Sequence, residues 1–240
     1  MDHVIDVNTQ FGPRPASATD LSVDVLAELM EQHGVRACCT LSTVGVLLDH
    51  NMGNAATRAA CGENRALLPV ATLDPTRHFS TENPFHKISA DGFRLVRFFP
   101  GAQGWSVDCA QMTRLIAGAN EVGIPVMVDI TASGEATRLL RSIGNHENSI
   151  ILSGVGERMV AEAIALMHDD ASVYVETSHL LSLGLISQII NTVGVERVLF
   201  GSGAPARPMG GVLGALRYVD LTDSQRSSIM GLNAIAALGL

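Results

Sequence analysis

The chain has 240 residues, of which 47% are hydrophobic and 17% charged, and its 24 acidic and 16 basic residues give a formal net charge of −8. This composition indicates a folded protein with one sizeable core and excludes a disordered chain. The negative charge and the lack of a basic cluster argue against nucleic-acid and membrane-surface partners. No apolar run reaches the ~18 residues of a membrane-spanning helix, and the start lacks a signal-peptide pattern, so we expect a cytoplasmic protein.

Two residue types limit the chemistry further. None of the cysteines has the spacing of a zinc site, and a chain of this size needs no disulfides, so we expect buried thiols. The cysteines are Cys38, Cys39, Cys61 and Cys109. Lys87 is the only lysine and precedes a predicted strand, which argues against Schiff-base chemistry and against a carbamylated lysine that bridges metals.

Short β-branched or apolar runs alternate along the chain with longer segments of helical periodicity. In chain order the runs predict eight strands: Val4–Phe11, Val35–Leu41, Leu67–Leu73, Phe93–Phe99, Pro125–Ile130, Ser149–Ser153, Ser172–Thr177 and Val195–Gly201. The longer segments predict helices over Asp20–His33, Asn51–Glu63, Asp108–Val122, Gly134–Ile143, Glu157–His168 and Leu183–Val193. In the first of these, Asp20 is the expected N-terminal cap and Gly34 the stop. Residues 74–91 are polar and proline-bearing, and predict only a weak helix.

Eight strand–helix alternations without a linker predict an α/β fold, a single (β/α)8 TIM-like barrel that forms one domain over residues 1–240. The alternative is an open, doubly wound sheet. It is favoured by Gly201-Ser202-Gly203-Ala204-Pro205-Ala206, which fits a dinucleotide-binding GxGxxA pattern after a strand. The motif follows the last strand, however, and Pro205 disturbs the helix start that would hold a pyrophosphate.

Three segments carry a resemblance to a known family. They are Ile5-Asp6-Val7-Asn8-Thr9-Gln10-Phe11-Gly12, Gly92-Phe93-Arg94-Leu95-Val96-Arg97-Phe98-Phe99-Pro100 and Arg197-Val198-Leu199-Phe200-Gly201-Ser202-Gly203-Ala204-Pro205. Together with the terminal Gly231-Leu232-Asn233-Ala234, they resemble the amidohydrolase superfamily, in the branch that contains aminocarboxymuconate semialdehyde decarboxylase and pyrone dicarboxylate lactonase. The resemblance covers almost the whole chain and implies a barrel that holds a divalent metal at the carboxyl ends of its strands.

The resemblance also shows where this chain departs from the family. The positions of the usual His-x-His pair are Asn8 and Gln10, and the histidine of strand five is Asp129. The positions of the strand-six histidine and the strand-eight aspartate are Gly154 and Gly203. Amide oxygens are poor zinc ligands and glycine offers no side chain, so we expect no metal and no other cofactor.

Polar residues at the carboxyl ends of the strands are the candidate site. They are Asn8, Gln10, Arg97, Asp129, Thr131, Glu176, Ser178 and His179. Arg97 either binds a substrate carboxylate or phosphate or forms an internal ion pair with Asp129 or Glu176.

Two residues of this set are the candidate catalytic groups. Asp129 and His179 are candidate proton carriers, although Asp129 could instead balance Arg97, and His179 could simply begin a helix. Gly203 leaves room and a backbone N–H for an anion, or is a plain turn residue.

Three functions are compatible with this site. The first is a metal-independent hydrolase, lactonase or decarboxylase that acts on a small, anionic carboxylate, with Asp129 and His179 as catalytic residues and Asn8, Gln10, Arg97 and Gly203 as binding residues. The second is a catalytically inactive barrel that binds a metabolite or a protein partner. The third is a metal enzyme with a relocated site at Asp129, Glu176 and His179. The apolar tail Ile229–Leu240 could form a homodimer interface or pack within its own chain.

Overall fold

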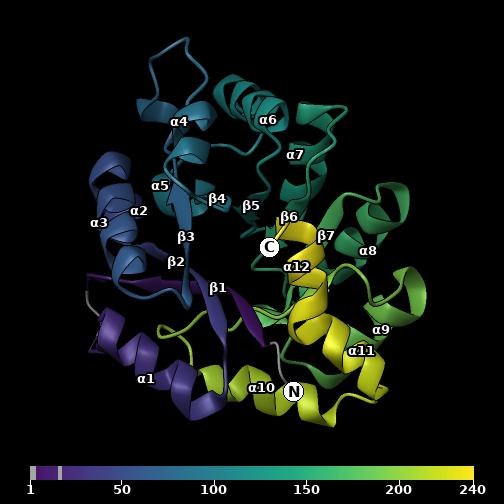
Figure 1. Ribbon diagram of the computed structural model, residues 1–240. Coiled ribbons are helices and arrows are strands. Elements are labelled where there is room, and N and C mark those ends of the chain that lie inside the picture. The colour runs from purple at the N-terminus through teal and green to yellow at the C-terminus, as the bar shows by residue number, and fades with distance from the viewer. Residues whose placement is uncertain (1–3, 16–17) are drawn as a thin grey trace.

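The computed structural model describes residues 4–15 and 18–240, and its parallel strands follow one another around the sheet in chain order (Figure 1). The strands are β1 (Ile5–Phe11), β2 (Ala37–Ser42), β3 (Leu67–Thr72), β4 (Leu95–Phe98), β5 (Val126–Asp129), β6 (Ile150–Ser153), β7 (Val173–Glu176) and β8 (Val198–Leu199). All eight predicted strands are confirmed, within a few residues at each end.

The last strand region pairs with the first, which closes the barrel. The N–H of Val7 donates to the carbonyl of Phe200 at 2.9 Å, and the N–H of Gln10 donates to the carbonyl of Ala204 at 3.0 Å. An open, doubly wound sheet would leave both edges unpaired and would reverse its strand order midway. The alternative prediction of a dinucleotide-binding sheet is therefore wrong, and the single (β/α)8 barrel is confirmed.

Helices cover the outside of the barrel and one of its ends (Figure 1). They are α1 (Val23–His33), α2 (Val44–Leu47), α3 (His50–Glu63), α4 (Phe85–Ala90), α5 (Pro100–Gln103), α6 (Ala110–Val122), α7 (Glu135–Ile143), α8 (Val160–Asp169), α9 (Leu183–Val193), α10 (Met209–Tyr218), α11 (Asp223–Ser227) and α12 (Asn233–Leu238). None of the helices in the described ranges is both long and apolar enough to cross a membrane.

The first helix shows how local chemistry sets an element's ends. Its cap is Ser22, whose Oγ accepts from the N–H of Val25 at 3.3 Å, and the prediction of Asp20 as the cap is wrong by two residues. Asp20 instead accepts from the N–H of Ser22, so it orders the turn before the helix. Gly34 ends the helix in the left-handed conformation, as predicted.

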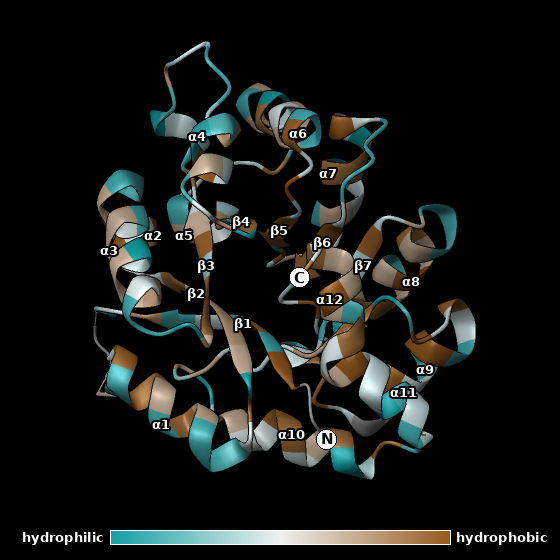
Figure 2. Cartoon of the chain, viewed as in Figure 1, coloured by the Kyte–Doolittle hydropathy of each residue, from teal (hydrophilic) through white to brown (hydrophobic). Residues whose placement is uncertain are grey.

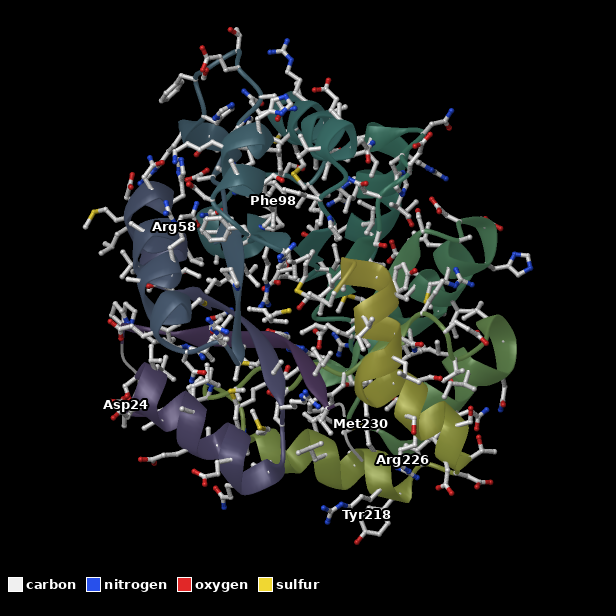
Figure 3. The ribbon with its side chains drawn as sticks, in the orientation of Figure 1. Asp24, Arg58, Phe98, Tyr218, Arg226 and Met230 are labelled. Carbon is white, nitrogen blue, oxygen red and sulfur yellow. The ribbon has the colours of Figure 1, made fainter. Side chains whose placement is uncertain are left out.

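Two apolar layers hold the fold together, one between strands and helices and one inside the barrel. Figure 2 shows hydrophobic residues gathered along the strands. Phe98 belongs to the outer layer, whereas Tyr218 projects from α10 into solvent (Figure 3). The inner layer contains Leu95 and Met127 from the strands together with Leu238 from α12. Asn233 of α12 binds carbonyls at the start of β8, so this helix covers the amino-terminal end of the barrel and leaves the carboxyl ends of the strands open.

The apolar tail packs within its own chain. Ile229, Ala234, Ala237 and Leu238 are all buried against the barrel. These side chains are therefore not available to a second copy, and a homodimer stays a prediction without support from this segment.

Candidate active site

A bulge in β1 lies beside two polar residues of this strand, Asn8 and Gln10, that line a pocket at the carboxyl ends of the strands. Asp6 pairs with Cys38 and Thr9 with Thr40, so Val7 and Asn8 together lie opposite one residue of β2. The Oδ1 atom of Asp6 accepts from the N–H of Asn8 at 3.0 Å. It also accepts from the N–H of Ser202, in the loop after β8, at 3.0 Å. The side chain of Asp6 thus supplies the hydrogen-bond acceptor for the N–H of Asn8 at the bulge.

The carboxyl ends of the strands surround one pocket of about 550 Å³. Six residues in its wall are those predicted to form the site: Asn8, Gln10, Arg97, Asp129, His179 and Gly203. Of the other polar candidates, Ser178 also lines the pocket, Glu176 lies buried behind it, and Thr131 is exposed and binds Glu135. The barrel brings these residues together because its parallel strands all end on the same side.

Arg97 lies almost fully buried, with 4% of its surface exposed. Its Nε and Nη2 atoms each lie 2.8 Å from Oδ1 of Asp129. Nη1 donates to Oδ1 of Asn8 at 2.6 Å, and Nη2 donates to Oγ of Ser153 at 3.2 Å. The ring of Phe99 covers the guanidinium at 4.7 Å. The internal ion pair with Asp129 is therefore present, while 27% of the Asp129 side chain stays exposed to the pocket.

Glu176 is a fully buried carboxylate surrounded by hydrogen-bond donors. Its Oε1 accepts from Oγ of Ser153 at 2.9 Å, from Oγ of Ser178 at 2.8 Å and from Nδ2 of Asn8 at 3.2 Å. Its Oε2 accepts from the N–H of Ser178 at 2.7 Å. These bonds satisfy the carboxylate with neutral groups alone.

His179 lies between a hydroxyl and a guanidinium. Its Nδ1 is 3.0 Å from Oγ of Ser178, and its Nε2 is 2.6 Å from Nη2 of Arg207. A guanidinium only donates, so these partners assign the proton to Nδ1 and the lone pair to Nε2. Burial, and then the charge of Arg207, lower the pKa of His179, which favours this neutral ring.

Arg207 was not predicted as a site residue, although the sequence carries a signal for it. It stands four residues after Gly203, in the loop that follows the last strand, and loops at this end of a barrel form the active site. Arg14 in the loop after β1 also lines the pocket and was missed for the same reason. Together with Arg97 they bring three guanidinium groups to a pocket that exposes one aspartate.

The residues at the family's metal positions do not suit a divalent cation. The guanidinium of Arg97 binds the Asn8 and Asp129 oxygens that would otherwise be ligands. A metal ion at the same oxygens would meet a positive charge in direct contact. Within residues 4–15 and 18–240, no three His, Cys, Asp or Glu side chains form a metal-binding group, so the relocated site at Asp129, Glu176 and His179 is not formed.

Solved structures of other proteins share this barrel over its full length. A 2,6-dihydroxybenzoate decarboxylase from Rhizobium superposes with a TM-score of 0.78 at 16% identity, covering 100% of this chain and 99% of its own. A probable 2-pyrone-4,6-dicarboxylic acid hydrolase from Acinetobacter baumannii with citric acid bound has a TM-score of 0.77 at 14% identity, covering 100% of both chains. A dihydroxybenzoic acid decarboxylase from Polaromonas sp. JS666, with bound manganese and the inhibitor 2-nitroresorcinol, has a TM-score of 0.76 at 14% identity, covering 100% of this chain and 98% of its own. At these identities the likeness shows the fold.

Sequence comparison gives the family. No curated protein matches the chain. The amidohydrolase family profile matches residues 51–240, which include β3 to β8 and the site residues Arg97, Asp129, His179 and Gly203. Asn8 and Gln10 lie before the matched segment. Because the match covers well over half of the sequence and agrees with the fold, the chain belongs to the amidohydrolase family.

Proposed function

We propose that this chain is a metal-independent enzyme that hydrolyses or decarboxylates a small carboxylate in the barrel pocket. Asp129 and His179 are its proton carriers. The substrate-contacting residues are Asn8, Gln10, Arg97 and Gly203. The N–H of Gly203, predicted to be a donor for an anion, donates to the carbonyl of Asn8 at 2.8 Å, so Gly203 would contact the substrate only through its Cα. The names of the similar structures support a carboxylated substrate, since they include benzoate decarboxylases and a pyrone dicarboxylic acid hydrolase.

One observation carries the proposal. The guanidinium of Arg97 is held among the oxygens of Asn8, Asp129 and Ser153, at the ends of three different strands. Paired with Asp129, it places a fixed guanidinium at the floor of the pocket, at the position where the resemblance to the family implies a metal. Fixed donors and charges in a closed site stabilise charge that develops during a reaction without having to reorganise.

His179 has the geometry of a general base once Nε2 is accessible. For a lactone or an amide, water would lose a proton to Nε2 while its oxygen adds to the carbonyl carbon. The tetrahedral adduct then expels the alkoxide or amine, which takes that proton from the imidazolium. Glu176 stabilises the imidazolium through Ser178, whose Oγ bridges Nδ1 and Oε1. A general base of this kind contributes a factor of about 10²–10⁴ in rate.

A barrel that binds without catalysis is the second candidate. It is favoured by the contact between Arg207 and Nε2 of His179, because that contact occupies the only lone pair of the ring. It is also favoured by the glycines at 154 and 203, two positions at which the resemblance to the family implies metal-binding side chains.

A substrate screen separates the two candidates. Lactones and carboxylated amides are incubated with the purified protein, with and without EDTA, and metal content is measured by elemental analysis. We expect turnover that EDTA leaves unchanged and that falls at least ~100-fold in Asp129→Asn and in His179→Gln. Thr131→Val is the matched control, since Thr131 follows the same strand two residues after Asp129 but is exposed to solvent. Turnover lost on chelation, or ligand binding without any turnover, would contradict the proposal.

A further inference from the structure

Arg207 carries a charge that no carboxylate neutralises within residues 4–15 and 18–240. It is half-buried in the pocket wall, and its Nη2 donates to the neutral ring of His179 at 2.6 Å. Arg97, at the floor of the same pocket, is different. Its charge is met by Asp129, and four of its N–H donors are used by Asp129, Asn8 and Ser153. An anion that enters the pocket therefore finds an available cation at Arg207.

The turn after β8 is built to place this arginine. Gly203 has φ of 75°, and a Cβ atom there would lie 2.9 Å from Cδ of Arg207. The carbonyl of Gly203 accepts from the N–H of Arg207 at 3.0 Å, which closes the turn. The missing side chain at 203 thus leaves room for the aliphatic part of Arg207 against its own turn.

We propose that Arg207 binds the anionic group of the substrate, and that this anion draws Arg207 away from Nε2 of His179 and so uncovers the base. The inference rests on the proposed function and adds to it a specificity-determining residue. A carboxylate forms shorter and stronger hydrogen bonds with a guanidinium than a neutral imidazole does, and it offers two oxygens to the planar donor fork. Only a molecule with an anionic group in reach of Arg207 frees the lone pair of His179.

The charges around His179 allow this exchange to be measured. Arg207 faces the ring from the β8 loop, Glu176 from β7, Asp129 from β5 and Arg97 from β4. Arg97 and Asp129 neutralise each other, and the bonds of Glu176 do not involve Arg207. When a carboxylate binds Arg207, the ring loses the repulsion of one adjacent cation. The pKa of His179 then rises toward its ordinary value.

The test follows the His179 ring by NMR in protein labelled with ¹⁵N-histidine, with His179→Gln identifying the signal. Benzoate is the anionic probe, and benzamide is a neutral probe of the same shape. We expect benzoate to raise the pKa of His179 by about one, a tenfold gain in proton affinity, whereas benzamide leaves it unchanged.

Variants locate the effect. Arg207→Met should raise the pKa of His179 without any ligand and weaken benzoate binding at least about tenfold. Arg114→Met, on the exposed face of α6, is the control and should change neither. Gly203→Ala gives an independent measurement, because its Cβ displaces Arg207 without removing the charge. It should also raise the pKa of His179 in the free protein.

The outcomes separate this inference from the proposed function. If benzoate binds but both the His179 pKa and the affinity are the same in Arg207→Met, the inference is wrong and the proposed function stands. The same holds if Arg14→Met, and not Arg207→Met, abolishes binding. If no carboxylate binds the wild-type pocket, both fail together.

Discussion

Arg97 determines the character of the pocket floor. Three of its partners come from β1, β5 and β6, and the ring of Phe99 lies against its face. Buried charges need such complete pairing, because each unpaired ion would retain most of its desolvation penalty. The residue therefore contributes to stability and to the site at once, and its two contributions can be separated by substitution.

Replacing Arg97 by methionine should lower the free energy of unfolding by about 3 kcal/mol, since Asp129 would lose its cation. The value lies at the low end of the range for broken buried pairs because the Asp129 side chain keeps 27% exposure. Urea denaturation measures it. Arg58→Met is the control: the Arg58 side chain is half-exposed, and its pair with Asp91 at the surface should contribute little to stability because solvent screens it. Equal losses in the two variants would contradict the buried-pair assignment.

The free energy of unfolding should fall as pH rises, because the buried carboxyl group of Asp6 loses its proton. Burial raises the pKa of Asp6 to about 7, and its Oδ2 has no hydrogen-bond partner in the described part of the chain. A raised pKa means that the folded state holds the proton more tightly, so stability is complete below pH 4 and is lost as pH rises through 7. Between pH 5 and pH 8 the loss should be about 2–3 kcal/mol.

Asp6→Asn should remove this loss while keeping an oxygen that accepts from Asn8 and Ser202. Urea midpoints at pH 5 and pH 8 are compared between the wild type and Asp6→Asn. The difference between them gives the contribution of Asp6 to the pH dependence, because His179 and all other titrating groups are the same in both proteins. Asp24→Asn, on the surface of α1 (Figure 3), should behave as the wild type. If the stability of Asp6→Asn falls between pH 5 and pH 8 as much as that of the wild type, Asp6 is not the group responsible for the loss.

At the level of elements, the pocket wall depends on a close contact between two helices. Gly45 of α2 and Gly53 of α3 meet backbone to backbone: a Cβ on Gly53 would lie 2.1 Å from the amide nitrogen of Gly45. The following residues of α2, Val46 and Leu47, line the pocket. This crossing therefore sets the width of the pocket on the β2 side.

Gly53→Ala should lower the free energy of unfolding by about 1–3 kcal/mol and shift α2, because the backbone of Gly45 cannot yield as a side chain would. Gly62→Ala in the same helix is the matched control, since nothing lies within 4 Å of its added Cβ. There alanine should stabilise the helix, by up to about 1 kcal/mol. Thermal or urea unfolding of the two variants measures the contrast, and a loss of similar size in both would count against the crossing.

For the whole molecule, closure of the barrel is what assembles the site. Asn8 from the first strand and Glu176 from the seventh are hydrogen-bonded although 168 residues separate them. The terminal helix supports this closure, because Nδ2 of Asn233 donates to the carbonyls of Val195 and Val198, at 2.7 and 2.9 Å. We therefore expect the barrel to unfold as one cooperative unit.

Asn233→Ala should lower the free energy of unfolding by about 2–3 kcal/mol, because it leaves two carbonyls at the start of β8 without their donor. Far-UV circular dichroism and the fluorescence of Trp105, the only tryptophan, should report a single transition in both proteins. Asn51→Ala, at an exposed position of α3, should change stability by less than about 0.5 kcal/mol. Separate transitions for the two signals would show that the terminal helix unfolds on its own.

The sequence by itself determined the order and type of the eight strands and of α1, α3, α6, α7, α8 and α9, since the periods of 2 and 3.6 are local properties of a chain. The ten-residue helix α10 was not predicted. The sequence also predicted the edge at which polar residues collect, because parallel strands all end on the same side. The four-residue helices α2 and α5 escaped prediction, because one turn is too short to show a period. The tertiary structure alone decided which side chains pair. Arg97 pairs with Asp129 and not with Glu176, and Arg207 covers His179. Both contacts join residues that are 28 or more positions apart in the sequence. Such contacts follow from strand register, turn geometry and the closure of the barrel, which no local pattern encodes.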